Sequence, residues 1–371
     1  MKGTPPMALA PTRPFRLAAL LAIAALILAA CGTVEADADT DTADADVNDA
    51  GDEDATDDAG GDLAWEPPED LEGSVTLYAA NPQGLNEDLA EQFADATGVD
   101  VEIYGDTTGS ITARLDAEWD NPQADVVYIA SWGPAAGYAA DGRVMDYTPE
   151  FADSIHPDWV ADGFYGRDGS ALALTVNTNV AESTPSDWED LTAEEFSDQV
   201  LMPDPRESGT ARDLVAAMVS TWGEDETWDL FDALFDNGME VQGANGPALD
   251  AVTAGSYAVV LGGVDYSAYS AIADGEALEV VFADSGTMVS PRPFFILDEA
   301  PNPENAQALV DFFLSGEGQE ASAASNMIPA QPDVPADHVD YADVDLLDYD
   351  LDAIEADGED ILNQFVSRYL D

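Results

Sequence analysis

Beyond residue 73, short apolar runs alternate with segments in which apolar residues recur every three or four positions. The run 75–79 is typical of a buried strand, whereas Leu85, Leu89 and Phe93 share one face of a helix that ends at Gly98. The alternation continues with a strand over 99–103, a helix carrying Ile111, Leu115 and Trp119, and a strand over 125–130. This β-α-β-α-β order predicts an open, mostly parallel sheet with right-handed crossovers.

A second α/β set follows in the middle of the chain. We expect a strand over 171–176, a helix that begins at Ser208-Gly209-Thr210, a helix around Phe231, a short helix from Asn245, and a strand over 257–261 that ends at Gly262-Gly263. An apolar strand over 294–297 and three further helices complete the chain. The fold class is therefore α/β, with two sets of strands and helices.

The first 30 residues are typical of an export signal. Lys2, Arg13 and Arg16 precede an uncharged apolar run over 17–30, which is too short for a relaxed transmembrane helix. The run ends in Leu28-Ala29-Ala30-Cys31, which resembles the bacterial lipobox, where the cysteine is lipidated and becomes the new N-terminus. An ordinary signal peptide followed by a chance cysteine is the alternative. Because Cys31 is the only cysteine, an intrachain disulfide and a cysteine-based metal site are excluded.

Charge narrows the possible partners. The chain has 77 Asp and Glu residues against 10 Lys and Arg, a formal net charge of −67. Nucleic acid is excluded as a partner because binding to phosphate backbones requires a basic face. Segment 31–72 is so acidic, with Trp65 as its one aromatic residue, that we expect a disordered tether there. Self-repulsion should make the folded part more stable in salt, as in halophilic proteins.

The candidate ligand site lies in the loops that follow the strands, because open α/β sheets bind ligands there. Two of these loops, Thr107-Thr108-Gly109-Ser110 and Ser208-Gly209-Thr210, come where helices are expected to begin. Free N–H groups and the helix dipole favour anions at such places, although plain N-capping would use the same residues. Ser131 and Trp132 follow the third strand, and the Trp132 ring could wall the cleft.

Arginine strengthens the expectation of an anion site, since Lys2 is the only lysine. Arg206 and Arg212 flank the Ser208 loop, and Arg114 follows Ser110 by about one helical turn. An anion that approaches so acidic a chain needs local positive charge, although each arginine could instead pair with a nearby acid.

Signals for catalysis are weak. His156 and His338 are the only histidines, and neither lies in a recognisable motif. The chain has no G-x-S-x-G elbow, no Walker A loop and no G-x-G-x-x-G fingerprint. We therefore expect a binding protein without enzymatic activity and without a cofactor.

The order of the motifs resembles the solute-binding proteins of bacterial ABC importers. A lipobox, an acidic tether, VTLYAA and NPQADVVY come first, followed by MPDPRESGT, GANGPALDAVTAGSYAVVLGG, SGTMVSPRP and NPENAQALVDFFLSGEGQ. The later runs are similar to the ferric-iron-binding type, whose relatives take phosphonates and phosphate esters. The resemblance covers about residues 73–335. It implies the two-lobed type II periplasmic-binding-protein fold, with the ligand closed between the lobes.

The resemblance also implies a domain order. The expected parts are a lipoprotein signal peptide at 1–30, the acidic disordered tether at 31–72, an N-terminal lobe from 73–172 and 288–371, and a C-terminal lobe at 173–287. Each lobe is expected to be an open, mostly parallel sheet flanked by helices. Hinge strands near 171–176 and 290–297 would join the two lobes.

The family's anion site corresponds to Ser208, Gly209 and Thr210, and its cleft asparagine to Asn245. Its iron ligands carry over only in part, because Val264-Asp265-Tyr266 stands where ferric members place two adjacent tyrosines. The candidate ligand-binding residues are Thr108, Gly109, Ser110, Ser131, Trp132, Arg206, Ser208, Gly209, Thr210, Asn245, Asp265 and Tyr266. No metal site is expected unless the ligand is ferric iron, for which Asp265, Tyr266 and Tyr269 are the candidates.

Together these features predict an extracytoplasmic protein, lipid-anchored through Cys31 to the bacterial cell membrane. As a monomer it would capture a small phosphoryl- or carboxylate-bearing anion and deliver it to an ABC permease. Ferric iron held with a synergistic anion is the alternative ligand. Two other classes stay open: a ligand sensor for a membrane kinase would share the fold, and a secreted hydrolase would need a nucleophile and a base at one cleft.

Overall fold

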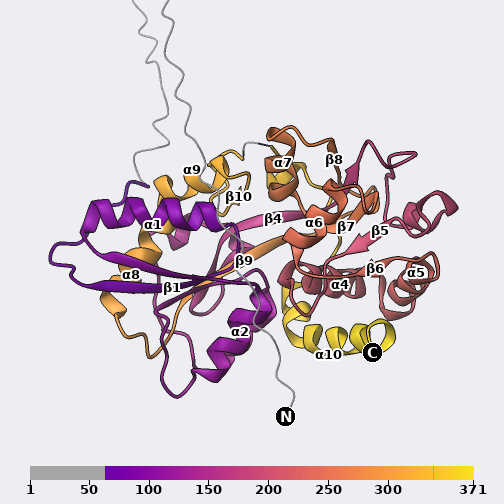
Figure 1. The fold of residues 1–371 in the computed structure, drawn as a ribbon. Helices are drawn as coiled ribbons and strands as arrows, with labels where there is room; N and C mark the ends of the chain where they lie inside the picture. Colours follow the sequence, from indigo (N-terminus) through magenta and orange to yellow (C-terminus); the bar gives the residue numbers. More distant parts are fainter. Residues whose placement is uncertain (1–62, 337) are drawn as a thin grey trace, which may run out of the picture. The chain divides into compact units, whose positions relative to one another are not determined.

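The computed structural model of this chain describes residues 63–336 and 338–371 (Figure 1). The expected signal segment, Cys31 and most of the expected tether lie outside these residues. The strands form one mixed sheet in the order β2-β1-β3-β9-β4-β7-β5-β6, and β8 and β10 both pair with β4 off this path. The expected α/β class is confirmed.

The first half of the sheet follows the predicted pattern. Strand β1 (Ser74–Ala79) pairs in parallel with β2 (Asp100–Gly105) on one side and with β3 (Val126–Tyr128) on the other. The helices that follow these strands are α1 (Gln83–Thr97), α2 (Thr108–Ala117) and α3 (Trp132–Ala140). Because the three strands are parallel, the loops at their carboxyl ends open at the same edge of the sheet.

Two long strands connect this half to the second one. Strand β4 (Phe164–Asn177) is buried along its whole length. Its first part pairs antiparallel with β9 (Val289–Ile296), and its second part, from Leu172, pairs antiparallel with β7 and β8. These are the strands expected as hinges. β4 begins well before the predicted start at 171, because Arg167 and Asp168 lie buried within it at an irregular register.

The second half is centred on β7 (Val259–Val264). Its other strands are β5 (Val200–Met202), β6 (Glu240–Val241) and β8 (Leu278–Val281), and its helices are α4 (Gly209–Trp222), α5 (Glu224–Asp236), α6 (Asn245–Thr253) and α7 (Asp265–Ala273). The predicted strand end at Gly262-Gly263 is wrong, since β7 continues through both glycines. Gly262 has a φ of 71°, and a Cβ on Gly263 would lie 2.9 Å from Thr175 Oγ1, so close packing requires glycine here.

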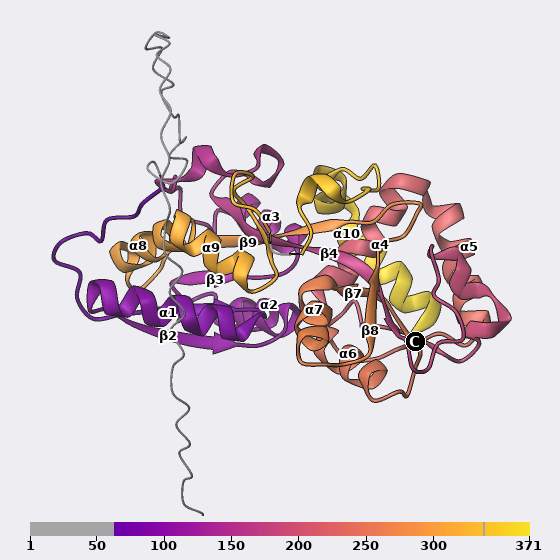
Figure 2. The same cartoon turned by 90° about the horizontal axis from the view of Figure 1, so that it is seen from above.

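After β9 the chain adds further helices to the first half and ends with a helix that packs on the second half. The remaining elements are α8 (Pro303–Phe313), α9 (Gly316–Ala324), β10 (Ile328–Pro329) and α10 (Leu351–Tyr369), together with the short 3₁₀ turns Ala152–Ser154, Pro157–Trp159, Glu189–Thr192, Glu194–Phe196 and Tyr341–Asp343. Figures 1 and 2 show α1, α8 and α9 on the half that carries β1, and α10 beside α4.

Helix α10 departs from the expected division into lobes. Its buried residues Ile354, Ile361 and Phe365 share a hydrophobic cluster with residues of α4 and α5 in the second half, rather than with β1 to β3. Phe365 packs edge-on against Phe231, with ring centroids 5.3 Å apart. The division at 172/173 and 287/288 stays a proposal, and α10 packs against both α3 of the first half and α4 of the second.

The described end of the expected tether is ordered against the first half. Trp65 is 8% exposed and lies with its ring 4.9 Å from Phe312 and 5.8 Å from Phe93. The carbonyl of Leu63 accepts a hydrogen bond of 2.9 Å from the Gly316 N–H. The expectation of disorder up to residue 72 therefore fails for 63–72, because one tryptophan buries enough apolar surface to dock the segment.

Within the described residues, none of the helices has both the length and the apolar character that a membrane crossing needs.

Candidate ligand-binding site

A cavity of about 280 Å³ lies where loops of the first half meet helix starts of the second. It is lined by the loops after β1 and β2, one residue that follows β3, the first residues of α4, α6 and α7, and one residue of β9. The lining residues are Ala80, Asn81, Pro82, Gln83, Asp106, Thr107, Thr108, Ala130, Glu207, Ser208, Gly209, Ala244, Asn245, Gly246, Pro247, Tyr266, Ser267 and Arg292. The loops after β1 and β2 and the starts of α4, α6 and α7 therefore meet at one cavity.

The start of α4 forms one wall of the cavity. Ser208 is the N-cap, and its Oγ accepts a hydrogen bond of 3.2 Å from the Ala211 N–H. Asn245, at the start of α6, donates through Nδ2 to Ser208 Oγ at 3.0 Å and to Thr210 Oγ1 at 2.9 Å. The structure thus brings together the three predicted residues Ser208, Thr210 and Asn245, although Thr210 is fully buried behind the lining. Two helix N-termini, with their free N–H groups, face one space.

Arg292 supplies the buried positive charge at this site, and the sequence reasoning missed it. The residue is 3% exposed and lines the cavity, while its Nε and Nη1 have no hydrogen-bond partner among the described residues. Its guanidinium carbon lies 5.2 Å from the centre of the Tyr128 ring and 5.5 Å from that of Tyr266. A buried guanidinium with unpaired donors is costly unless a ligand or water completes it.

A sequence signal for Arg292 did exist. It is the only charged residue in the apolar run 288–297 (MVSPRPFFIL). An ionised side chain in a run that is otherwise typical of a buried strand needs a partner or a function.

Arg206, the predicted cation, lies elsewhere. Its guanidinium pairs with Asp204, with Nε–Oδ1 at 2.9 Å and Nε–Oδ2 at 3.0 Å, and half of its side chain is exposed. It does not line the cavity, and neither does Arg212. The prediction of Arg206 as a ligand residue is thus not supported by the geometry, because a local carboxylate satisfies it.

The loop before α2 contributes Thr107 and Thr108 rather than Gly109 and Ser110. Thr107 caps the helix by accepting a hydrogen bond of 3.2 Å from the Ser110 N–H, and Ser110 Oγ lies 3.1 Å from Thr107 Oγ1. A Cβ on Gly109 would lie 2.4 Å from the Arg206 carbonyl oxygen. Ser110 therefore belongs to the capping structure, and Gly109 is glycine because the backbone of the second half approaches it.

Ser131 and Trp132 are buried behind the cavity and do not line it. Ser131 Oγ donates to Asp213 Oδ1 at 2.6 Å, and the Trp132 N–H donates to Asp213 Oδ2 at 3.1 Å. Burial raises the pKa of Asp213 to about 6, against the opposing effect of these hydrogen bonds. The expected ligand contacts of Ser131 and Trp132 are replaced by a junction between α3 and α4.

Of the three candidate iron ligands, only Tyr266 lines the cavity. Asp265 is fully buried, and neither of its carboxylate oxygens has a hydrogen-bond partner within residues 63–336 and 338–371. Burial raises its pKa to about 8. Tyr269 stacks on His338, with ring centroids 4.5 Å apart, and does not line the cavity. In the described part of the chain, no group of three or more His, Cys, Asp or Glu side chains is arranged to hold a metal ion.

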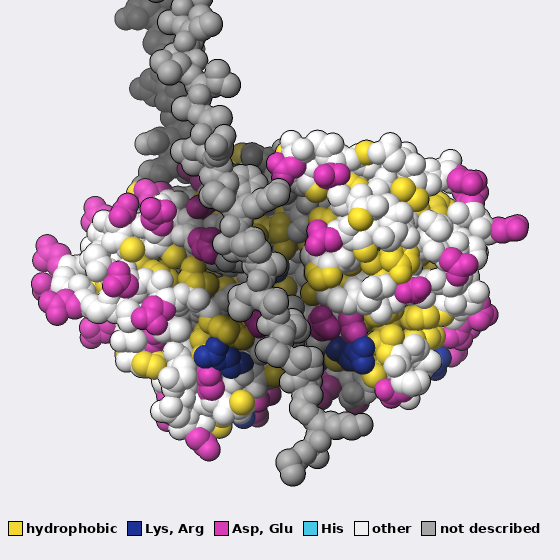
Figure 3. All heavy atoms as spheres, in the orientation of Figure 1, with side chains coloured by type: hydrophobic (Ala, Val, Ile, Leu, Met, Phe, Trp, Pro, Cys, Tyr) yellow, Lys and Arg dark blue, Asp and Glu magenta, His cyan; other side chains and the backbone are white. Residues whose placement is uncertain are grey.

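Outside the cavity the charge is strongly negative. Figure 3 shows Asp and Glu side chains spread over this face of the molecule, with Lys and Arg side chains at only a few places. A buried guanidinium in such a molecule marks a specific place for an anion, since the surface as a whole repels one.

The model of the family described as bacterial extracellular solute-binding protein matches residues 121–353, and the chain belongs to this family. Among curated relatives, the chain is 26% identical to "Probable ABC transporter periplasmic-binding protein y4fP" of Sinorhizobium fredii, over 72% of this chain and 76% of that protein. It is 24% identical to "Putative 2-aminoethylphosphonate-binding periplasmic protein" of Salmonella typhi, over 73% of this chain and 83% of that protein.

Solved structures share the fold. The periplasmic binding protein AfuA from Actinobacillus pleuropneumoniae, solved with exogenous fructose-6-phosphate bound, matches with a TM-score of 0.75 and 25% identity, over 81% of this chain and 99% of that one. Iron-bound HitA from Pseudomonas aeruginosa matches with a TM-score of 0.71 and 21% identity, over 79% of this chain and 99% of that one. The expected type II periplasmic-binding-protein fold and the solute-binding class are confirmed.

Proposed function

We propose that this protein captures a small phosphoryl- or carboxylate-bearing anion in the cavity between the two halves of its sheet and delivers it to an ABC permease. The observation that carries the proposal is Arg292, a buried guanidinium with two unpaired nitrogens that lines the cavity. It shares that cavity with the start of α4 and with Asn245. Charged donors and helix N-termini together are the ordinary protein environment of a phosphoryl group.

Binding would take place without chemistry. Neither histidine lines the cavity: the His156 ring packs near Tyr341 at 4.6 Å, and His338 stacks on Tyr269. A hydrolase would need a base within hydrogen-bond reach of its nucleophile at the same cleft. This placement favours a transport protein over a secreted hydrolase.

The proposal extends to the location of the protein. We infer export by the segment 1–30 and lipid attachment at Cys31, on the strength of the lipobox-like residues 28–31 and the extracellular family. The ordered Trp65 segment would then be the end of the tether on the protein body. We also infer a monomer that binds no nucleic acid, because a net charge of −67 repels both phosphate backbones and other copies of the chain.

A thermal-shift screen of the purified protein tests the ligand class. The panel consists of fructose 6-phosphate, 2-aminoethylphosphonate, inorganic phosphate, citrate and ferric citrate. We expect at least one iron-free anion to raise the melting temperature, since a ligand present at 100 times its Kd stabilises the fold by about 2.7 kcal/mol. A shift with ferric citrate and none with any iron-free anion would instead support iron with a synergistic anion, for which the Tyr266 hydroxyl is the candidate ligand that lines the cavity.

A further inference from the structure

Among the described residues, Arg292 Nε and Nη1 have no hydrogen-bond partner, although the buried carboxylate of Asp168 belongs to the same surroundings. Tyr128 connects the two: its hydroxyl donates to Asp168 Oδ1 at 2.6 Å, and its ring centre lies 5.2 Å from the Arg292 guanidinium. Asp168 and Arg292 nevertheless form no ion pair in the described part of the chain. Whether Arg292 stays free for a ligand therefore depends on which group pairs with the Asp168 carboxylate.

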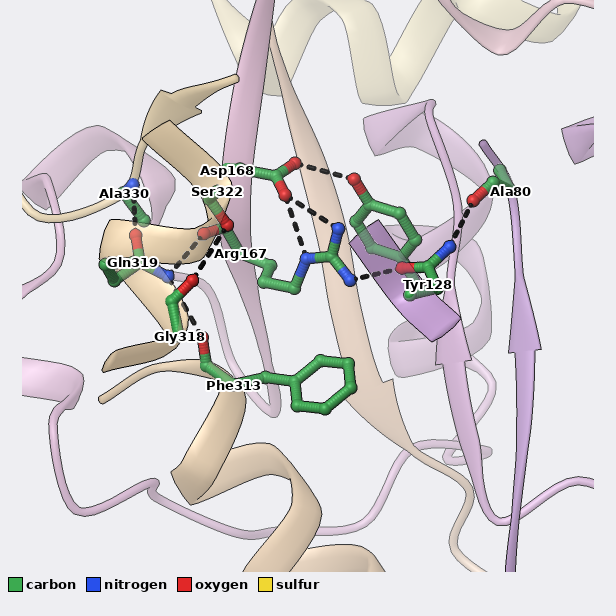
Figure 4. A network of polar contacts seen from close by, with 10 residues as sticks. Ala80, Tyr128, Arg167, Asp168, Phe313, Gly318, Gln319, Ser322 and Ala330 are labelled. Carbon is green, nitrogen blue, oxygen red and sulfur yellow. Dashed lines mark hydrogen bonds and ion pairs between the residues drawn. The ribbon is translucent and has the colours of Figure 1, made fainter. Parts of the chain in front are cut away.

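The Asp168 carboxylate pairs with Arg167, the residue that precedes it in the chain. Arg167, which is fully buried, donates through Nε to Asp168 Oδ2 at 2.9 Å, and its Nη2 lies 2.8 Å from the same oxygen (Figure 4). The Arg167 guanidinium also lies 3.6 Å from the centre of the Tyr128 ring. Both carboxylate oxygens of Asp168 are thus engaged, one by Tyr128 and one by Arg167.

The backbone explains how two consecutive residues can pair. In a regular strand, side chains of neighbouring residues point to opposite faces. The register between β4 and β9 shifts between Gly166 and Gly169, an irregularity that brackets Arg167 and Asp168. Such a bulge re-aims side chains, here so that both reach one network.

The same network reaches the cavity at a second point. Arg167 Nη1 donates to Asn86 Oδ1 at 2.6 Å, and Asn86 Nδ2 donates to the Ala80 carbonyl at 2.9 Å. Ala80 lines the cavity. At the other end, the Arg167 carbonyl accepts a hydrogen bond of 2.9 Å from Gln319 Nε2, which fixes the bulge against α9.

We propose that Arg167 is a positioning residue that holds Asp168 away from Arg292 and so keeps the Arg292 guanidinium free for an anion in the cavity. The inference rests on the proposed anion-binding function and adds a specificity element to it. Without Arg167, Asp168 would be a buried carboxylate that keeps, among the described residues, the Tyr128 hydroxyl as its hydrogen-bond partner, and Arg292, which lies over the same Tyr128 ring, would be a cation free to pair with it. An intramolecular carboxylate would then compete with the ligand for the same guanidinium.

A double-mutant cycle separates this role from simple structural support. Calorimetric titration with fructose 6-phosphate and with 2-aminoethylphosphonate would compare the parent, Arg167→Leu, Asp168→Asn and the double variant Arg167→Leu/Asp168→Asn. We expect Arg167→Leu to raise Kd at least about tenfold, because an internal ion pair replaces the charged hydrogen bond to the ligand. The double variant should recover to within about threefold of the parent, since the amide that replaces the Asp168 carboxylate carries no charge to compete.

Two results would overturn the inference. In the first, Arg167→Leu binds the probes as tightly as the parent. In the second, the double variant binds as weakly as Arg167→Leu or more weakly. That result would mean that the effects of the two substitutions add, as they do when each one only removes structural support.

A crystal structure of Arg167→Leu tests the inference without any ligand. We expect an Asp168–Arg292 ion pair, and unpaired Arg292 nitrogens in that variant would contradict the proposal. If the parent bound none of the iron-free anions of the thermal-shift panel while the variant showed this ion pair, the proposed ligand class would be wrong and the positioning role would stand.

Discussion

Replacing Gly209 by alanine should weaken ligand binding, because there is no room for a side chain where α4 begins. An added Cβ would lie 2.4 Å from the Ala130 carbonyl oxygen, 2.7 Å from its carbonyl carbon and 3.0 Å from Ser131 Cβ. These atoms belong to the junction of β3 and α3 in the first half of the sheet. Two of the three are backbone atoms, which cannot rotate away, so the start of α4 must move back.

The size of the effect follows from the packing. Forcing one extra methyl group into a close-packed contact costs about 1–3 kcal/mol. Moving α4 back also displaces Ser208 from the cavity, so we expect the cost to appear mainly in binding. At about 1.4 kcal/mol for each factor of ten, Kd should rise about 5- to 150-fold.

The assay is calorimetric titration with fructose 6-phosphate and 2-aminoethylphosphonate, combined with thermal unfolding of each variant. Gly137→Ala is the matched control, since it lies in α3 and its added Cβ meets no atom within 4 Å. If Gly209→Ala matched Gly137→Ala in both affinity and melting temperature, the close approach of α4 to Ala130 would not matter for binding, and the reasoning would be refuted.

Three further predictions concern other parts of the molecule. Trp65→Ala should lower the free energy of unfolding by about 3–5 kcal/mol, measured by urea denaturation, because it empties a buried aromatic site. Burial raises the pKa of Asp265 to about 8, so its contribution to stability falls as pH rises from about 4 to 8. Asp265→Asn should therefore flatten that decline in melting temperature, and an unchanged slope would argue against a buried acid. Cys31→Ser should release the protein from the membrane fraction, as judged by immunoblotting, and full retention would contradict lipidation.

The sequence predicts the framework of the fold because local patterns specify it. Alternation and helical spacing identify β1, α1 and β2, and Gly98 ends α1 in the left-handed conformation, with φ of 78°. The end of β7 is different, because Gly262-Gly263 normally indicates a strand end. Here the two glycines continue the strand because other side chains approach them closely: Leu214 approaches Gly262, and Thr175 approaches Gly263. Both of these neighbours lie on other elements, so the local sequence does not reveal them.

The sequence predicts the parts of the candidate site that are formed by the backbone at helix starts. It predicts less well which arginine is free, because that depends on which carboxylates pair with each arginine. Ser208 and Asn245 lie at helix starts and follow from local sequence. Arg206 and Arg292 carry the same charge, but only the structure shows that Asp204 pairs with Arg206 and that the buried Asp168 pairs with Arg167 rather than with Arg292. The outcome of such competition depends on residues far apart in the chain.

The most direct test of the anion-binding claim is to measure the Kd of the iron-free anion that binds best, for the parent, Arg292→Met and Arg206→Met. Arg206→Met is the control, because it removes an arginine that does not line the cavity. Hydrogen bonds to a charged group contribute about 1.5–3 kcal/mol, which corresponds to about 10- to 150-fold in Kd. We predict a loss of that size for Arg292→Met and a Kd close to that of the parent for Arg206→Met. Unchanged affinity in a folded Arg292→Met protein would contradict the account.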